Sequence, residues 1–308
     1  MADRYHSPLP SMVMALAGFA SFAIGDAIVR SMAGAWPGSA VALLRYSVAA
    51  LGLAVVLLMR EGKAGFAPSS LPIQICRGAA IAMNGALFWI SLSYMPLADS
   101  TAIQFTNPVW AAALSAIFLG EAIRGRQIAY MLLAFAGVLV VLQPNVAAFG
   151  AGALVPLIAA VGMSSLMVLN RVLGTRGSLI GNQFWLAAVA SIVLVPATIA
   201  GHFSGIGNLA VTWPSAVTVI KCMVVAMTGT LGHLLLFKAT LRASAAAMAP
   251  MAYVQILFAV LLGWLLFHSP PTPSMLFGAA IIIGAGWMLI RANMRLAKAI
   301  GESGANPN

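Results

Sequence analysis

The stretch Tyr94-Met-Pro-Leu-Ala-Asp-Ser-Thr-Ala102 leads into an apolar segment that ends at Phe118-Leu-Gly-Glu121. A basic loop and another apolar segment come next. Roughly 145 to 149 residues later, Ala239-Thr-Leu-Arg-Ala-Ser-Ala-Ala-Ala247 leads into an apolar run that ends at Leu266-Phe-His-Ser269. The same outline therefore occurs twice, which predicts an internal duplication.

The positive charges change sides between the two copies. The loop before the paired segments contains no Lys or Arg in the first copy, whereas the second copy carries Lys238 and Arg242 there. The loop after them contains Arg124 and Arg126 in the first copy and no Lys or Arg in the second. A duplication with an odd number of membrane crossings needs this reversal, because its second copy inserts upside down. The pattern therefore predicts two inverted repeats.

The composition places the chain in a membrane. Hydrophobic residues make up 62% of the sequence, charged residues make up 7%, and the mean hydropathy is +0.99. Soluble domains average about a quarter charged residues. We therefore predict an all-α integral membrane protein with ten transmembrane helices, which span roughly 12–31, 38–59, 72–93, 98–119, 127–143, 151–171, 181–200, 215–236, 245–267 and 275–291.

Five helices belong to each predicted half. The first repeat covers residues 11–145, the second inverted repeat covers 150–297, and residues 298–308 form a cytoplasmic tail. With the N and C termini both cytoplasmic, the loops on the outer face carry no Lys or Arg, which fixes the orientation by the positive-inside rule. The inner face then collects Arg4, Arg60, Lys63, Arg77, Arg124, Arg126, Arg171, Arg176, Lys238, Arg242, Arg291, Arg295 and Lys298.

Several classes of function are excluded. The net charge of +10 comes from Lys and Arg spread in ones and twos between apolar runs, so nucleic acid is not a partner. The chain has no phosphate-binding Gly-x-x-x-x-Gly-Lys-Ser/Thr loop, which excludes ATP-driven transport by this chain alone. Its histidines have no metal-ligand spacing and its acids do not pair, so we expect no enzyme, no metal site and no cofactor.

Charged and titratable residues inside the spans need a reason. Asp26 and Arg30 share a helix face, and Arg45 lies at a similar depth in the next span. Asp26 either pairs with Arg30 or Arg45 to dock two helices, or faces a water-filled cavity and meets a solute or a proton. Arg30 can also snorkel to the interface. His233 is a hydrogen-bonded core residue, a cavity residue or a proton carrier.

Neutral polar residues mark two further helices. Gln104 and Asn107 share a face directly before Pro108, which removes a backbone hydrogen bond and predicts a helix break. In the second half Pro250, Tyr253 and Gln255 lie on the comparable ninth span, where Tyr253 and Gln255 are two residues apart and point to roughly opposite sides. Polar faces beside helix breaks are typical of transporter sites, whereas interhelical hydrogen bonding is the alternative. We therefore predict these solute-contacting residues: Asp26, Arg45, Asn84, Gln104, Asn107, His233, Tyr253 and Gln255.

Three motifs resemble the drug/metabolite transporter superfamily, specifically its EamA-type ten-helix carriers. They are Pro96-Leu-Ala-Asp-Ser-Thr-Ala102 with Asn107-Pro108, Gly25-Asp26-Ala27, and Pro250-Met-Ala-Tyr253-Val-Gln255. One departure is that His268-Ser269 replaces the Gly-Glu that often ends this helix in the second copy. The resemblance implies inverted five-helix halves around a central cavity, alternating access for small metabolites, and a multi-pass protein of the bacterial inner membrane.

The expected function is secondary active transport of a small metabolite, with export as the expected direction. Amino acids, nucleotide-related compounds and drug-like solutes are candidate substrates, and protons are a candidate coupling ion. The alternatives are an uptake carrier and a lipid flippase or scramblase, the latter with a groove open to the bilayer beside Trp89 or Trp185. The expected partners are the solute and membrane lipid, and the protein is a monomer or a homodimer.

Overall fold

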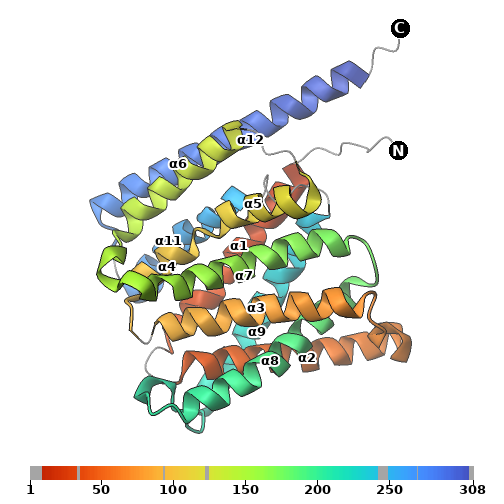
Figure 1. Cartoon of the computed structure of the whole chain (residues 1–308), viewed down its shortest axis with the longest axis vertical. Helices are drawn as coiled ribbons and strands as arrows, with labels where there is room; N and C mark the ends of the chain where they lie inside the picture. The colour runs from red at the N-terminus through yellow and green to blue at the C-terminus, as the bar shows by residue number, and fades with distance from the viewer. Residues whose placement is uncertain are drawn as a thin grey trace.

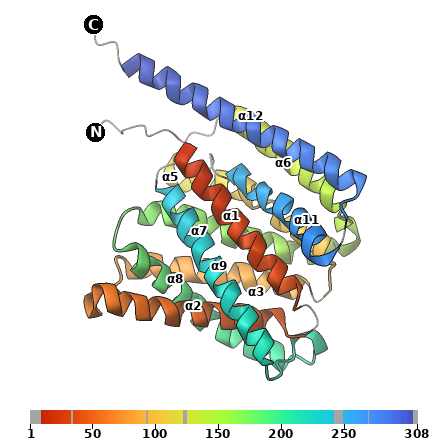
Figure 2. The same cartoon turned by 180° about the vertical axis from the view of Figure 1, so that it is seen from behind.

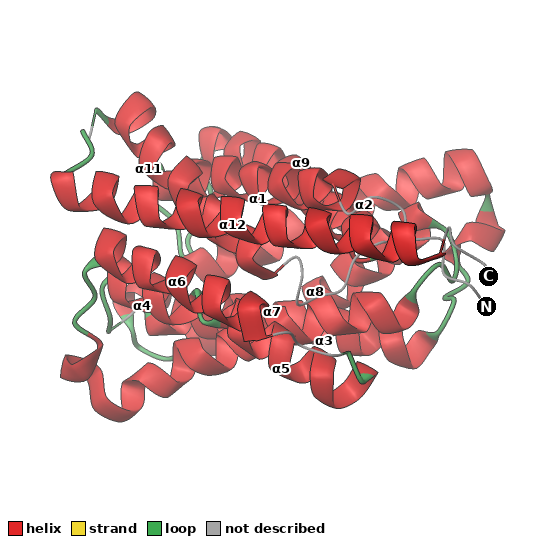
Figure 3. Ribbon diagram, turned by 90° about the horizontal axis from the view of Figure 1, so that it is seen from above, coloured by secondary structure: helices red, strands yellow, loops and turns green. Residues whose placement is uncertain are grey.

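The computed structural model describes residues 9–32, 35–92, 94–121, 125–241, 249–268 and 270–304. Arg4, Arg124, Arg242, Ser269 and the last four residues of the predicted tail lie outside these ranges. Within the described part of the chain every regular element is a helix, as Figure 3 shows. Lipid offers no partner to backbone N–H and C=O groups, and a helix satisfies both internally.

The elements of the two halves follow one another without interruption by a soluble domain. In the first half they are α1 (Leu9–Arg30), α2 (Gly38–Glu61), η1 (Lys63–Phe66), α3 (Leu71–Ser91), α4 (Leu97–Gln104), α5 (Asn107–Leu119) and α6 (Gly125–Leu142). After η2 (Val146–Ala153), the second half contains α7 (Leu154–Leu173), α8 (Leu179–His202), η3 (Gly207–Leu209), α9 (Ala216–Thr240), η4 (Ala249–Tyr253), α11 (Val254–Phe267) and α12 (Pro273–Gly304).

The predicted membrane helices are confirmed. Nine described segments are long and apolar enough to cross a bilayer, and α4 together with α5 counts as one of them. The remaining predicted span, 245–267, corresponds to the shorter apolar helix Met251–Phe267. Large apolar side chains such as Leu51, Ile117 and Ile192 are exposed on the outside of the bundle. Such exposure is expected where the surrounding solvent is hydrocarbon.

The helices pack in pairs that correspond between the halves. α6 lies along α12 at one edge of the molecule and α2 packs on α8 at the other, while α1 packs on α9 and α11 between them (Figures 1 and 2). In the same way α7 packs on α3 and α5. The contact of α1 with α9 corresponds to that of α7 with α3, and the contact of α1 with α11 corresponds to that of α7 with α5. The predicted duplication would give this correspondence, and both the duplication and the inversion of the second copy stay predictions.

Small residues let the paired helices approach closely. A Cβ atom added to Gly278 of α12 would lie 2.6 Å from the carbonyl oxygen of Gly137 in α6, and one added to Gly137 would lie 2.8 Å from the carbonyl oxygen of Gly278. Close backbone approach compensates for the absence of a hydrophobic driving force between helices in lipid. The α6–α12 edge therefore depends on these two glycines.

In each half a proline lies at or beside a change in the helical backbone. α4 ends at Gln104 and α5 begins at Asn107, with Pro108 in the first turn of α5. Pro108 has no N–H group to donate to the preceding turn, and Phe105 and Thr106 form the bend between the two helices. In the second half Pro250 lies in η4, directly before α11.

Candidate functional site

Asp26 of α1 and Gln255 of α11 form a hydrogen bond between the two halves of the chain. Nε2 of Gln255 donates to Oδ2 of Asp26 at 2.6 Å. Asp26 is exposed although it lies in a membrane-spanning helix that packs on both α9 and α11. An ionisable side chain in that position needs a polar or hydrated surrounding. The sequence left open whether Asp26 pairs with an arginine, and in this structure its hydrogen-bond partner is an amide.

The two arginines near Asp26 have other contacts. Nη2 of Arg45 donates to the Tyr46 hydroxyl at 2.8 Å, and its guanidinium lies 4.4 Å from the centroid of the Tyr46 ring. The guanidinium of Arg30 lies 5.1 Å from the ring centroid of Phe267 in α11. Among the described residues neither arginine has a carboxylate oxygen within 4.0 Å. Arg45 is still close enough to Asp26 for the two charges to interact through space.

Arg45 and His233 line one small cavity between α2, α8 and α9. The cavity measures about 20 Å³, which is little more than one water molecule fills. His233 is buried, and its ring lies 4.8 Å from Phe22 of α1 and 6.4 Å from Tyr46. The structure therefore gathers four predicted site residues, Asp26, Arg45, His233 and Gln255, on four helices around Phe22 and Tyr46.

Asn84, Gln104 and Asn107 lie elsewhere, around α7. Nδ2 of Asn84 donates to the carbonyl oxygen of Ala159 at 2.8 Å, which joins α3 to α7. Asn107 is buried, and its backbone carbonyl accepts a hydrogen bond from the hydroxyl of Ser164 in α7 at 2.7 Å. Oε1 of Gln104 is buried without a hydrogen-bond partner. Asn84 and Asn107 thus make hydrogen bonds between helices, as the alternative interpretation of these polar residues expects. Whether they also contact a solute stays a prediction.

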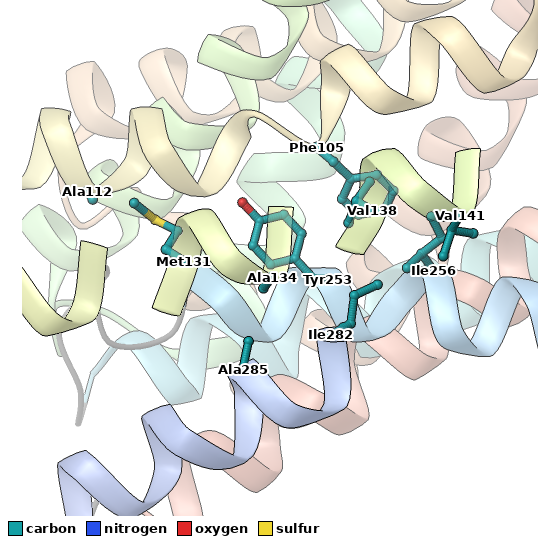
Figure 4. Close-up of a cluster of buried hydrophobic side chains, with 10 residues drawn as sticks. All are labelled: Phe105, Ala112, Met131, Ala134, Val138, Val141, Tyr253, Ile256, Ile282 and Ala285. Atoms are coloured by element: carbon teal, nitrogen blue, oxygen red, sulfur yellow. The ribbon is translucent and has the colours of Figure 1, made fainter. Parts of the chain in front are cut away.

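Tyr253 and Gln255 point to different parts of the structure. Tyr253 is fully buried in an apolar cluster with Phe105, Met131 and Val138 (Figure 4), and its hydroxyl has no hydrogen-bond partner. Two residues apart on one helix face roughly opposite sides. Gln255 therefore faces Asp26 of α1, whereas Tyr253 faces the apolar cluster between α5, α6 and α12.

Two polar residues of the interior were not among the predicted site residues. Gln183 of α8 lines the same cavity as Arg45, is 2% exposed, and has no partner for its Nε2 atom. Arg77 was counted as an inner-face charge, yet it is 0% exposed inside α3. The only sequence signal for both is a polar residue within a predicted span.

Acceptors from three helices surround Arg77. Its Nε donates to Oδ1 of Asn170 at 2.8 Å, and its Nη1 donates to the carbonyl oxygen of Asn182 at 3.1 Å and to Oε1 of Gln74. The guanidinium also lies 5.2 Å from the ring centroid of Phe237 in α9. Arg77 therefore connects α3, α7, α8 and α9 near the end of the bundle at which α3 begins.

A second cavity is apolar. It measures about 280 Å³ and is lined by residues of α4, α6, η2 and α7, with Thr106 as its polar contribution. Neither Trp89 nor Trp185 lines this cavity or the smaller one. Nε1 of Trp185 donates to the carbonyl oxygen of Phe66 at 3.1 Å. The groove that the lipid alternative expects beside these tryptophans does not coincide with either of the two cavities.

The comparisons with known proteins agree with this architecture. One solved structure, described only as the crystal structure of a protein, has a TM-score of 0.77 over 93% of this chain and 98% of its own, at 15% identity, which shows the shared fold. Similar curated proteins include an S-adenosylmethionine uptake transporter of Rickettsia bellii, 27% identical over 71% of this chain and 72% of its own length. Others are the pseudopaline exporter CntI of Pseudomonas aeruginosa strain UCBPP-PA14, 24% identical over 89% and 93%, and a riboflavin transporter of Brucella anthropi, 26% identical over 83% and 88%.

The family comparison covers both halves separately. The model of the EamA-like transporter family matches residues 9–143 and again residues 150–291. The family and the similar proteins are transporters rather than enzymes, as the sequence predicted, and all of the similar proteins named above are bacterial. With its apolar membrane-length helices, the chain is a multi-pass membrane protein. It belongs to the EamA-like transporter family.

Proposed function

We propose that this protein is a secondary transporter that moves a small metabolite across the membrane by alternating access. The observation that carries the proposal is the exposed Asp26 carboxylate, which lies in a membrane-spanning helix, interacts through space with Arg45 and is hydrogen-bonded across the halves to Gln255. Ionisable groups at such depth are costly, and they mark solute or ion pathways in membrane proteins. A hydrogen bond that served only to dock α1 on α11 would be expected to be buried between the helices rather than exposed.

Alternating access needs one end of the pathway to be closed while the other is open. Arg171 of α7 forms an ion pair with Glu121, which follows α5, and it also donates to the carbonyl oxygen of Thr240 at the end of α9. The ends of these three helices are thereby tied together. Asp26, which is exposed, lies toward the opposite end of the bundle, four residues before α1 ends. We propose that the structure represents a state closed at the Arg171 end, which is the predicted cytoplasmic face.

The names of the similar proteins define the first solutes to test. They are named for S-adenosylmethionine uptake, pseudopaline export and riboflavin transport, so both directions occur among them. We propose a polar or amphipathic metabolite as solute and export as the direction. His233 is the candidate proton carrier, since it is a titratable side chain that lines the Arg45 cavity.

The test is transport by the purified full-length protein in liposomes. Radiolabelled S-adenosylmethionine and riboflavin are loaded on either side of the membrane, with and without an imposed pH gradient. We expect flux of at least one solute above that of protein-free liposomes. If neither these two solutes nor a wider set of amino acids and nucleosides moves in either direction, the proposed function is wrong.

A lipid flippase is the second candidate, and the apolar cavity of about 280 Å³ is the observation that favours it. Its apolar lining suits an acyl chain better than a polar metabolite. Liposomes that contain a fluorescent phospholipid and are quenched by dithionite from outside distinguish the two candidates. Complete quenching in the presence of the protein would favour lipid movement, whereas quenching of about half the signal, as in protein-free liposomes, would exclude it.

A further inference from the structure

Three side chains that line the cavity between α2, α8 and α9 offer hydrogen-bond donors, and Thr230 and His233 complete its polar lining. Arg45 contributes a guanidinium, which stays protonated in proteins. Gln183 contributes an Nε2 amide group that is buried without an acceptor. The Tyr46 hydroxyl oxygen already accepts from Arg45, so its own proton is left to donate. Among the described residues, no Asp or Glu lines the cavity.

The fixed charges of this region leave Arg45 without close compensation. Among the described residues the only carboxylate within ion-pair distance of any cation is Glu121, and its partner is Arg171. The Asp26 carboxylate acts on Arg45 from a distance and is itself held by Gln255. A buried donor without an acceptor destabilises the folded state. The cavity therefore favours any group that brings acceptor atoms and a negative charge.

Size and shape narrow the class of that group. The cavity of about 20 Å³ accommodates one small group and excludes a ring system. The planar fork of a guanidinium matches a carboxylate in bidentate geometry. The position that a Cβ atom would take on Gly229 lies 3.7 Å from Nη1 of Arg45, so the guanidinium lies against α9 at this glycine.

We infer that the cavity lined by Arg45, Gln183 and Tyr46 receives the carboxylate of the transported solute, so that the protein selects amino-acid-like metabolites. Asp26 and Gln255 then face the cationic part of the same solute from α1 and α11. Arg45 and Gln183 are binding residues that recognise the solute by its negative group. This inference rests on the proposed transport function and assigns it a substrate class.

Matched pairs of solutes that differ in one carboxylate test the inference. The probes are S-adenosylmethionine against its decarboxylated amine, and L-phenylalanine against phenethylamine, with riboflavin as a solute that has no carboxylate. Each is measured in the same liposomes by transport and by competition. We expect the carboxylate-bearing member of a transported pair to have at least a tenfold lower apparent KM. Equal KM values for both members would overturn the inference.

Variants of the cavity separate recognition from structure. Arg45→Gln should raise the apparent KM of the carboxylate-bearing probe at least tenfold and leave that of its decarboxylated partner unchanged. Arg45→Lys should restore part of the difference, and Gln183→Leu should reduce it about threefold. Arg30→Gln, whose side chain does not line the cavity, is the matched control. Thermal unfolding in detergent confirms that each variant is folded.

The outcomes also distinguish failure of the inference from failure of the proposed function. Transport of riboflavin or of the decarboxylated amines alone would leave the transport function standing and overturn the carboxylate site. An equal loss for both members of a pair in Arg45→Gln would reduce Arg45 to a structural role. If no probe moves at all, the transport function fails, and the substrate class that depends on it fails with it.

Discussion

Nε of Arg171 lies 2.9 Å from Oε1 of Glu121, and the same arginine donates through Nη1 to the carbonyl oxygen of Thr240, also at 2.9 Å. The hydroxyl of Ser115 donates to the other oxygen of Glu121. One carboxylate and one guanidinium therefore hold the ends of α5, α7 and α9 together. Since the side chains are only partly buried, we assign this pair a stabilisation of about 1 kcal/mol.

Replacement of Arg171 by Gln is expected to loosen this end of the bundle. If the closed state loses about 1 kcal/mol of stabilisation, the equilibrium shifts about fivefold toward the open state. Hydrogen-exchange mass spectrometry should show faster exchange at the ends of α5, α7 and α9. Arg176→Gln is the control, because this neighbouring arginine is exposed and has no ion pair among the described residues. Equal exchange in both variants would contradict a gating role.

Replacement of Arg77 by Met is expected to destabilise the fold. The substitution leaves Oε1 of Gln74 and Oδ1 of Asn170 buried without their donor, at a cost of about 1–3 kcal/mol for each acceptor. The melting temperature in detergent should fall by several degrees, whereas Arg60→Met at an exposed position should change it little. Adding Asn170→Leu should recover part of the loss, since removal of both partners is far less costly than removal of one.

Two glycines of α12 should respond in opposite ways to the same change. Gly278→Ala places a methyl group 2.6 Å from the carbonyl oxygen of Gly137 and should separate α6 from α12, which lowers the melting temperature. A Cβ atom on Gly284 has nothing within 4 Å, so Gly284→Ala should be neutral or slightly stabilising through its better helix propensity. If both variants lose stability, the close approach of Gly278 to Gly137 is not the cause of the loss.

Asp26→Asn should reduce transport at least tenfold while the protein stays folded. The carbonyl oxygen of the asparagine still accepts the hydrogen bond from Gln255, so the contact between α1 and α11 survives, but the charge is lost. Initial rates in liposomes and the melting temperature are measured together. Glu61→Gln, an exposed acid at the end of α2, serves as the control. Normal flux in Asp26→Asn would reduce Asp26 to a structural residue.

The membrane helices were predictable because length and apolarity alone determine them. Spans such as 38–59 and 181–200 differ from α2 and α8 by only a few residues at either end. The pairing of helices was not predictable in the same way. It depends on small residues such as Gly137 and Gly278 meeting across two segments that are 141 residues apart.

The candidate site was predictable in residue type but not in partnership. Polarity inside a span identified both Asp26 and Gln255, whereas their hydrogen bond needs the tertiary packing of α1 on α11. Arg77 resembled a topology signal, because it lies near the end of a span and its three acceptors come from separate segments. Gln183 lies in the second turn of α8, where a polar residue commonly faces the interface.

α12 is 32 residues long, so at 1.5 Å per residue it measures about 48 Å, well beyond the ~30 Å of bilayer hydrocarbon. It begins in contact with α6 and ends at the same end of the molecule at which α1 begins (Figure 1). A helix of this length extends beyond the hydrocarbon layer at one end or at both ends. A fluorescent protein and a secreted phosphatase, each fused after the last residue of the chain, therefore report which compartment the end of α12 enters.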